Sequence, residues 1–197
     1  MTDAAASTVE GKPKRHLPGE EGMWAFIWGD LLVFTIFFNL FSYYRAHDVA
    51  LFEHCRELLS RWQGLINTLL LLTGSLFVAV AVSSAREGRH QRAGRLLLCG
   101  IACSVGFGVS KVIEYTIKIR HGYTLQTNDF FMFYYMLTGI HMVHVIVATA
   151  ILVFLWAKTR APEHDRNYIA LMESGGIFWH MVDLLWVVLF ALLYLLV

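Results

Sequence analysis

Charged residues are scarce in this chain. Lys, Arg, Asp and Glu make up 16% of its 197 residues, whereas a soluble domain usually carries about 25%. Hydrophobic residues make up 57%, and the mean hydropathy is +0.54. This composition excludes an ordinary soluble domain and predicts an integral membrane protein. The net charge of +1 gives no support to nucleic-acid binding, and few residues remain outside the apolar runs for a second, soluble domain.

Cysteine is scarce as well. The chain has three, Cys55, Cys99 and Cys103, and no Cys-x-x-Cys pattern. An odd number at these spacings suggests neither a disulfide framework nor a zinc site, so we expect three small buried hydrophobic side chains. A cleavable signal is also missing, because residues 1–21 are polar and no small-residue cleavage site follows. We expect residues 1–21 to be a disordered cytoplasmic tail.

Five long apolar runs dominate the rest of the chain. About 20 helical residues, rising 1.5 Å each, cross the roughly 30 Å of hydrocarbon in a bilayer. The runs are apolar on all sides rather than alternating with period two, which predicts helices and not barrel strands. We therefore predict an all-α bundle of five transmembrane helices in one domain, residues 22–197. The expected spans are 22–44, 63–85, 94–118, 130–157 and 173–197, with charged or polar loops such as 45–61 between them.

The distribution of Lys and Arg predicts an orientation. With the N-terminus inside, the inner segments hold ten Lys and Arg residues and the outer segments five. Cytoplasmic loops carry the excess of positive residues in membrane proteins. The expected topology has a cytoplasmic N-terminus and a periplasmic C-terminus.

Ionisable residues inside the spans are the candidate functional residues, because charge is costly in lipid. Lys111 and Glu114 lie three apart in the third span, on one helix face where they can form an ion pair. A pair is cheaper to bury than either charge alone. It either fixes helix packing or leaves Glu114 as a protonatable carboxylate that senses or relays protons. Asp30, in the first span, is a second buried carboxylate that could likewise be proton-linked.

Histidines provide the other intramembrane polar groups. His141 and His144 share a face of the fourth span, and His180 lies in the fifth. Together they could hold a metal, but Met142 stands where a His-Glu-x-x-His zinc helix needs Glu. We expect interhelical hydrogen bonds instead, and no metal site. His180 and Asp183 are expected to tie the fifth span to its neighbours.

Two further patterns concern helix packing and catalysis. Glu173 is a third carboxylate in an apolar run and is also expected to be an interhelical polar group. Gly100, Ser104 and Gly108 recur every four residues, a face for close packing within the bundle or against another subunit. No Ser-His-Asp, Cys-His or glycine-rich phosphate arrangement is found, so we predict no catalytic residue.

These motifs together resemble subunit III of the haem-copper oxidases, over about residues 22–197. Any one motif is common, but their order and spacing are specific. The first span has Asp30 where the family commonly has Glu. The other matching motifs are Asn67-Thr68, Glu114-Tyr115, Gly-x-His-x-x-His-Val at 139–145, and Glu-x-x-x-x-x-Trp-His-x-Val-Asp-x-x-Trp at 173–186.

The number of spans places the chain within the family. Mitochondrial-type members have seven spans, and this chain lacks the first two. In this it is similar to the bacterial quinol-oxidase form and to the short NorE-type proteins associated with nitric oxide reductase. Gly29-Asp30, and Lys111 beside Glu114, favour the NorE type. The resemblance implies a multi-pass protein of the bacterial inner membrane.

The resemblance also implies roles. Subunit III binds no haem or metal of its own, packs beside the catalytic subunit that holds them, and supports sustained turnover. It binds phospholipid in a cleft between its first two helices and the rest, which must form differently or open to a partner here. The family's third-span Glu is a buried, reactive carboxylate near proton uptake and carries over to Glu114. Its conserved-type structural and interface groups carry over to His141, His144, His180 and Asp183.

We therefore predict a non-catalytic accessory subunit of a respiratory haem-copper oxidase or nitric oxide reductase. Two alternatives remain. One is a stand-alone enzyme, or a proton or ion carrier, that uses Lys111, Glu114 and the three histidines, although the internal repeats common in carriers are not found. The other is an assembly factor that binds the reductase transiently.

Overall fold

The computed structural model describes residues 21–161 and 167–196, and this part of the chain is helical, with no strand. Five helices are long and apolar enough to cross a membrane, which confirms the predicted helical bundle. The predicted tail lies outside the described residues, apart from Glu21 at the start of the first helix. The helices are α1 (Glu21–His47), α2 (Val49–Glu57), α3 (Arg61–Arg86), α4 (His90–Arg120), α5 (Asp129–Lys158) and α6 (Tyr168–Phe190), which continues as a π-helical turn (Ala191–Leu195).

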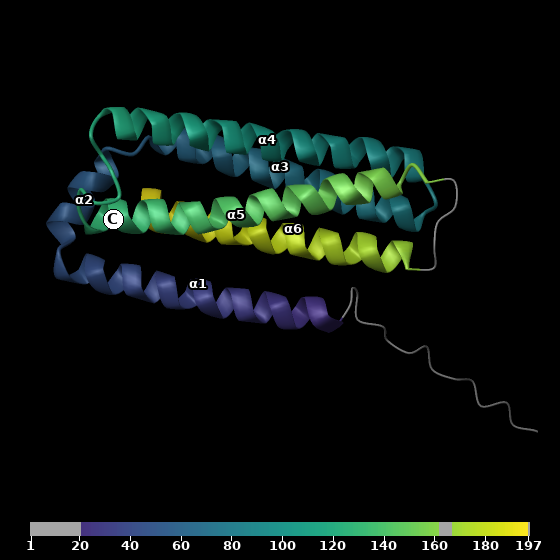
Figure 1. Cartoon of the computed structure of the whole chain (residues 1–197), viewed down its shortest axis with the longest axis horizontal. Helices are drawn as coiled ribbons and strands as arrows, with labels where there is room; N and C mark the ends of the chain where they lie inside the picture. Colours follow the sequence, from purple (N-terminus) through teal and green to yellow (C-terminus); the bar gives the residue numbers. More distant parts are fainter. Residues whose placement is uncertain (1–20, 162–166, 197) are drawn as a thin grey trace, which may run out of the picture.

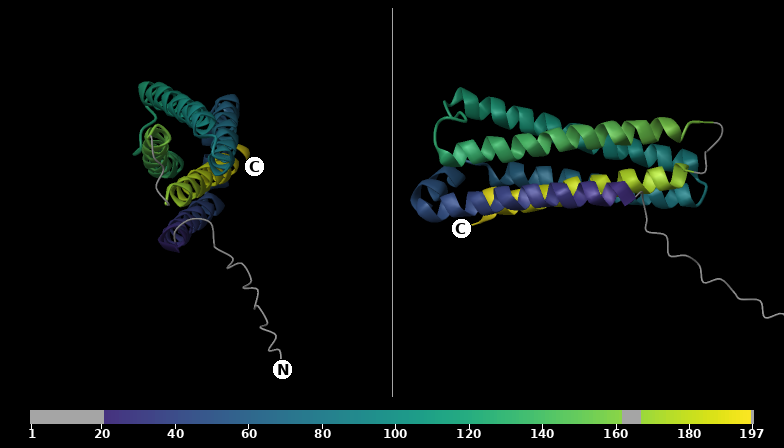
Figure 2. Two further views of the ribbon diagram at one scale, coloured as in Figure 1. Left: turned by 90° about the vertical axis from the view of Figure 1, so that its right-hand side faces the viewer. Right: turned by 60° about the horizontal axis from the view of Figure 1, so that its bottom comes forward.

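Helices α3 to α6 form a four-helix bundle. Helix α3 packs beside α4 and α6, and α5 packs beside the same two helices, while α1 lies outside the bundle against α5 and α6 (Figures 1 and 2). Helix α1 has Ile27, Phe34 and Phe41 buried at a spacing of seven residues, while most of its other side chains are exposed or half-buried. One end of the bundle carries the α3–α4 turn and the C-terminal end of α5, and α2 lies at the other end (Figure 1).

The segment 45–61, predicted as a loop, is partly helical, so that prediction was wrong. Asp48 caps α2 by accepting a hydrogen bond from the backbone N–H of Leu51. Helix α2 buries the side chains of Phe52 and Cys55. Its nine residues include too many charged ones for the sequence to predict a membrane span there. Burial raises the pKa of the Cys55 thiol, against the opposing effect of a hydrogen bond from Asn128.

The cysteine prediction holds for only one residue. Cys55 is buried, but Cys103 is half-buried and Cys99 is exposed on the outer side of α4. A thiol is small and nearly apolar, so the outer surface of a membrane helix accepts it as readily as the interior.

The face of small residues on α4 meets different neighbours along its length. A Cβ on Gly100 would lie 3.1 Å from Val78 Cγ2 of α3, so the two helices approach closely there. Ser104 forms a side-chain hydrogen bond with Thr149 of α5. A Cβ on Gly108 would meet no atom within 4 Å. Close packing inside the bundle is thus confirmed at Gly100 and Ser104 and is wrong at Gly108.

Candidate functional site

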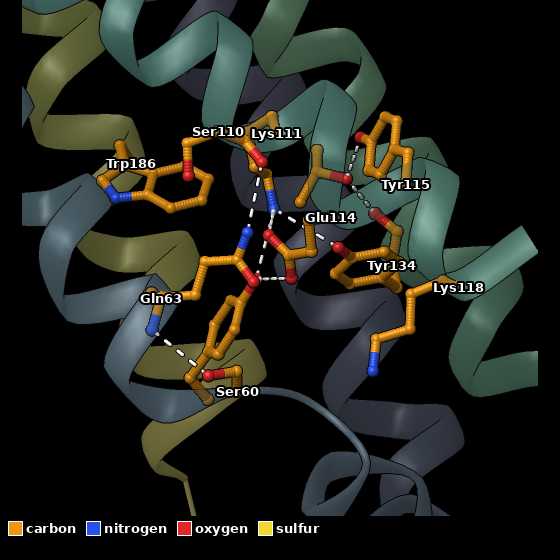
Figure 3. A network of polar contacts seen from close by, with 12 residues as sticks. Ser60, Gln63, Ser110, Lys111, Glu114, Tyr115, Lys118, Tyr134 and Trp186 are labelled. Atoms are coloured by element: carbon orange, nitrogen blue, oxygen red, sulfur yellow. Dashed lines mark hydrogen bonds and ion pairs between the residues drawn. The ribbon is translucent and has the colours of Figure 1, made fainter.

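The predicted ion pair is present and buried. Lys111 Nζ lies 2.9 Å from Glu114 Oε2, and the exposed fractions of the two side chains are 0% and 2%. Two tyrosines from other helices complete the cluster (Figure 3). The ammonium donates to the hydroxyls of Tyr194, at 3.1 Å, and Tyr134, at 3.3 Å, and Tyr194 OH donates to Glu114 Oε1 at 2.7 Å. Both charges are therefore neutralised within the cluster.

Aromatic rings enclose the Lys111 ammonium. Its Nζ lies 5.0 Å from the ring centroids of both Tyr134 and Trp186, where the negative face of a ring attracts a cation. The Trp186 ring is held in place because its Nε1–H donates to Thr68 Oγ1 at 3.1 Å. These aromatic residues were not predicted as part of the site, because aromatic residues occur throughout the spans and no local spacing marks the ones that meet Lys111.

A second polar contact joins α1 to the bundle. Asp30 Oδ1 lies 3.0 Å from His144 Nε2, and the two side chains are 12% and 17% exposed. His144 Nδ1 also faces the carbonyl oxygen of Ile140 at 2.9 Å. Both ring nitrogens of His144 thus face oxygen atoms. This contact joins α1 to α5 through Asp30, which we predicted as a buried carboxylate, and His144, which we predicted as an interhelical polar group.

The polar residues of α6 reach α3. His180 Nδ1 lies 2.6 Å from Ser75 Oγ, and Glu173 Oε1 forms an ion pair of 2.8 Å with Arg86. Through these contacts His180 and Glu173 join α6 to α3. Asp183 is 6% exposed and neighbours Ser75, but its Oδ1 has no hydrogen-bond partner among the described residues.

His141 does not make the interhelical hydrogen bond that we predicted. Its side chain is fully buried. The centre of its ring lies 5.8 Å from that of Phe107, which is edge-on to it, and 5.3 Å from that of Trp186. Neither ring nitrogen has a partner in the described part of the chain. The reason is position, since this turn of α5 faces an aromatic part of the core.

The three intramembrane histidines are not brought together. His144 points toward α1 and His180 toward α3, whereas His141 lies in the bundle core. Within residues 21–161 and 167–196, no group of three His, Cys, Asp or Glu side chains is placed to hold a metal ion. Apart from His141, these polar residues contact side chains of other helices.

With this geometry established, comparison with known proteins assigns a family. The sequence model described as cytochrome c oxidase subunit III matches residues 18–197. This chain belongs to that family. Together with its five apolar helices, this makes it a multi-pass membrane protein.

Relatives within the family differ in how much of their length the chain covers. Cytochrome c oxidase subunit 3 of Alkalihalophilus pseudofirmus is 26% identical over 193 residues, which is 96% of this chain and 89% of that protein. Cytochrome c oxidase subunit 3 of Anopheles gambiae is 28% identical over 66% of this chain. The match spans 48%, about half, of the length of the Anopheles protein. The heme-copper oxidase subunit I+III of Aeropyrum pernix is 26% identical over 88% of this chain and 22% of its own length.

Proposed function

We propose that this chain is a non-catalytic accessory subunit that binds the catalytic subunit of a haem-copper oxidase in the membrane. The chain would act as a single transmembrane domain, residues 22–197, without haem or metal of its own. It would support the stability, lipid contact and sustained turnover of the subunit that carries the haem and metal. The family assignment supports this reading, as does the Aeropyrum protein whose name joins subunits I and III.

The observation that carries the proposal is the exposed imidazole of His180. It belongs to the outward-facing stripe of α6, where the other exposed side chains are aliphatic: Leu184, Val187 and Val188. His180 is twelve residues from the start of α6 at Tyr168, about 18 Å along a helix, and therefore lies deep in the span. A polar side chain at that depth normally faces protein or water rather than lipid.

Neighbouring polar groups extend this exposed position into a surface. Ser75 bonds to His180, and the Asp183 carboxylate beside them keeps one oxygen without a described partner. A membrane helix of another subunit that offers a polar side chain at this depth would hydrogen-bond to the exposed His180 imidazole, whereas the Asp183 oxygen is buried and out of its reach. We define the α3–α6 face by Ser75, His180 and Leu184 and propose it as the surface that binds the catalytic subunit.

The finer assignments are part of the same proposal. Lys111 beside Glu114, and Gly29-Asp30, support a NorE-type subunit of a nitric oxide reductase complex in a bacterial inner membrane. The cluster around Glu114 supports a structural role for that carboxylate more than a role in proton entry, because its bonds to Lys111 and Tyr194 occupy both of its oxygens. A stand-alone carrier would need such a group to be accessible.

Co-purification tests the proposal. The tagged full chain would be isolated from native membranes in mild detergent, and the optical spectrum and co-purifying chains recorded. We expect a haem spectrum and a catalytic subunit with the wild type, and loss of both with Leu184→Trp and with His180→Leu. The control is Val109→Trp, another exposed aliphatic position but on α4, which should retain the partner.

Other outcomes would contradict it. A colourless, monodisperse chain from native membranes would favour a carrier or a transient assembly factor. If partner binding is lost with Val109→Trp but kept with Leu184→Trp, the interface lies on the opposite side of the bundle. Loss of a bound metal from His180→Leu would contradict the purely structural role of His180.

A further inference from the structure

We propose that the outer side of α1 pairs with α1 of a second copy of this chain, forming a parallel dimer in the membrane with Asn39 at the contact. Helix α1 lies outside the four-helix bundle, so its side away from α5 and α6 faces outward (Figures 1 and 2). The proposal goes beyond the proposed function and does not rest on it, because the α3–α6 face is a different surface.

Exposed residues on the outer side of α1 follow a coiled-coil repeat. The side that faces the bundle carries the buried Ile27, Phe34 and Phe41. On the opposite side, exposed residues alternate steps of four and three along the helix, and we call this set the outer seam: Ala25, Gly29, Leu32, Ile36, Asn39, Tyr43 and Ala46. A repeat of 3.5 residues keeps one line of side chains against a partner helix over several turns.

Asn39 is the polar member of the outer seam. It lies six residues before Arg45, about 9 Å along the helix, and therefore within the span. Its Nδ2 donates to the backbone carbonyl of Thr35 at 2.8 Å, and the amide has no other hydrogen bond in the described part of the chain. One N–H and the carbonyl oxygen thus face outward unpaired. Polar side chains at such a depth normally face protein or water rather than lipid.

The neighbouring hydroxyls on α1 do not share this need. Thr35 and Ser42 are also exposed, but each donates its proton to the backbone carbonyl four residues earlier, at 2.7 Å and 2.9 Å. A hydroxyl bonded in this way has no unpaired donor. The unpaired donor on this side of the helix is therefore the amide of Asn39.

A second copy supplies the matching group. Two copies of one membrane chain insert in the same direction, so a twofold axis along the membrane normal places Asn39 beside Asn39 of the second copy at equal depth. Each amide carries donors and an acceptor, so the two amides donate to and accept from each other. One Asn in an otherwise apolar coiled-coil seam fixes both the register and the number of helices. A small residue at Gly29, where a Cβ would meet no atom within 4 Å, allows the two backbones to approach closely.

Disulfide cross-linking in native membranes tests the geometry. In a full-length background without Cys55, Cys99 and Cys103, Leu32→Cys should give an oxidised dimer and Val33→Cys should not. The two positions have nearly the same depth, and both are exposed, at 62% and 45%. Their side chains point about 100° apart around the helix, so that only Leu32 lies in the outer seam. A disulfide requires Cα atoms within about 7 Å, which random encounters rarely hold.

An association measurement tests the role of Asn39. Energy transfer between donor-labelled and acceptor-labelled copies of the full chain would be recorded in liposomes at a series of protein-to-lipid ratios. We expect Asn39→Leu to weaken dimerisation at least about tenfold, because two interhelical hydrogen bonds are lost. Asn39→Gln keeps both amide groups and should retain most of the association. Ser42→Ala is the control and should associate as the wild type does, because its hydroxyl is already bonded within the helix.

Three outcomes would overturn the proposal. The first is no energy transfer by the wild type above the level of random encounter, and the second is unchanged association of Asn39→Leu. The third is equal cross-linking of Leu32→Cys and Val33→Cys. A cross-link from Leu32→Cys to a different chain would also overturn it, because the outer seam would then bind another subunit rather than a second copy. None of these results bears on the α3–α6 face, which is tested by its own variants.

Discussion

At the scale of single residues, the Lys111–Glu114 pair shows how a membrane protein keeps a full positive and a full negative charge in its interior. Each formal charge has the other within 2.9 Å, two tyrosine hydroxyls complete the hydrogen bonds, and aromatic rings surround the ammonium. Taking two charges out of water is expensive, and their attraction offsets that cost only with good geometry and satisfied hydrogen bonds. The pair therefore fixes how α4 packs against α5 and α6.

Glu114→Ala should destabilise the bundle strongly. It leaves the Lys111 ammonium buried without its counter-charge, a change that costs about 3–5 kcal/mol in other buried pairs. Thermal melting of the detergent-solubilised chain would measure the loss. The double variant Lys111→Met/Glu114→Ala should recover much of it, because no charge is then stranded. A single variant that melts at the wild-type temperature would show that the pair contributes nothing to stability.

At the scale of elements, α1 is the helix least integrated into the fold. It packs on the outside of α5 and α6, with one narrow stripe of buried side chains. A polar contact between Asp30 of α1 and His144 of α5 links α1 to this surface. Its depth in the membrane means that a broken link would leave polar groups facing lipid.

A double-mutant cycle on Asp30→Ala and His144→Ala should reveal coupling between the two residues. Interhelical polar contacts in membrane proteins are worth about 0.6–1.7 kcal/mol, and we expect a coupling free energy of unfolding in that range. The matched control pairs Asp30→Ala with His180→Ala, which bonds to α3 instead. Additive effects for Asp30 and His144 would mean that α1 is held by its apolar stripe alone.

At the scale of the whole molecule, orientation follows from charge. The α3–α4 turn is rich in arginine and the α4–α5 turn is not, which predicts that the α3–α4 turn lies in the cytoplasm.

Cysteine labelling on intact cells would test this topology. In a background without Cys55, Cys99 and Cys103, a membrane-impermeant maleimide should label Gln126→Cys from outside and Glu87→Cys only after the cells are opened. Glu87 and Gln126 are both exposed in turns at opposite ends of the bundle, so each serves as the control for the other. The reverse labelling pattern would place the N-terminus in the periplasm.

Local sequence patterns were sufficient wherever the cause is local. The five spans follow from apolar length, and the predicted ends lie within five residues of the observed ones when the π-helical turn is counted with α6. The ion pair of Lys111 and Glu114 could be predicted, because a spacing of three residues puts the two side chains on one face of one helix. Helix α2 was not predicted, because nine residues with several charges give no signal of a membrane span. Its cap at Asp48 and the packing of Phe52 and Cys55 stabilise it.

Contacts between segments far apart in the chain could not be predicted from the spacing of residues in the sequence. The sequence placed Asp30, His144, Ser75 and His180 in spans, but which of them meet depends on how four helices and α1 rotate against one another. The same rotation places the His141 side chain in an aromatic part of the core and the His180 side chain on the outside of the bundle. By itself, then, the sequence determined an apolar five-helix membrane protein with a buried ion pair, because these depend on composition and on contacts within one turn of helix. Only the tertiary structure decided which polar groups join helices and which face outward, since that depends on side-chain packing between segments far apart in the chain.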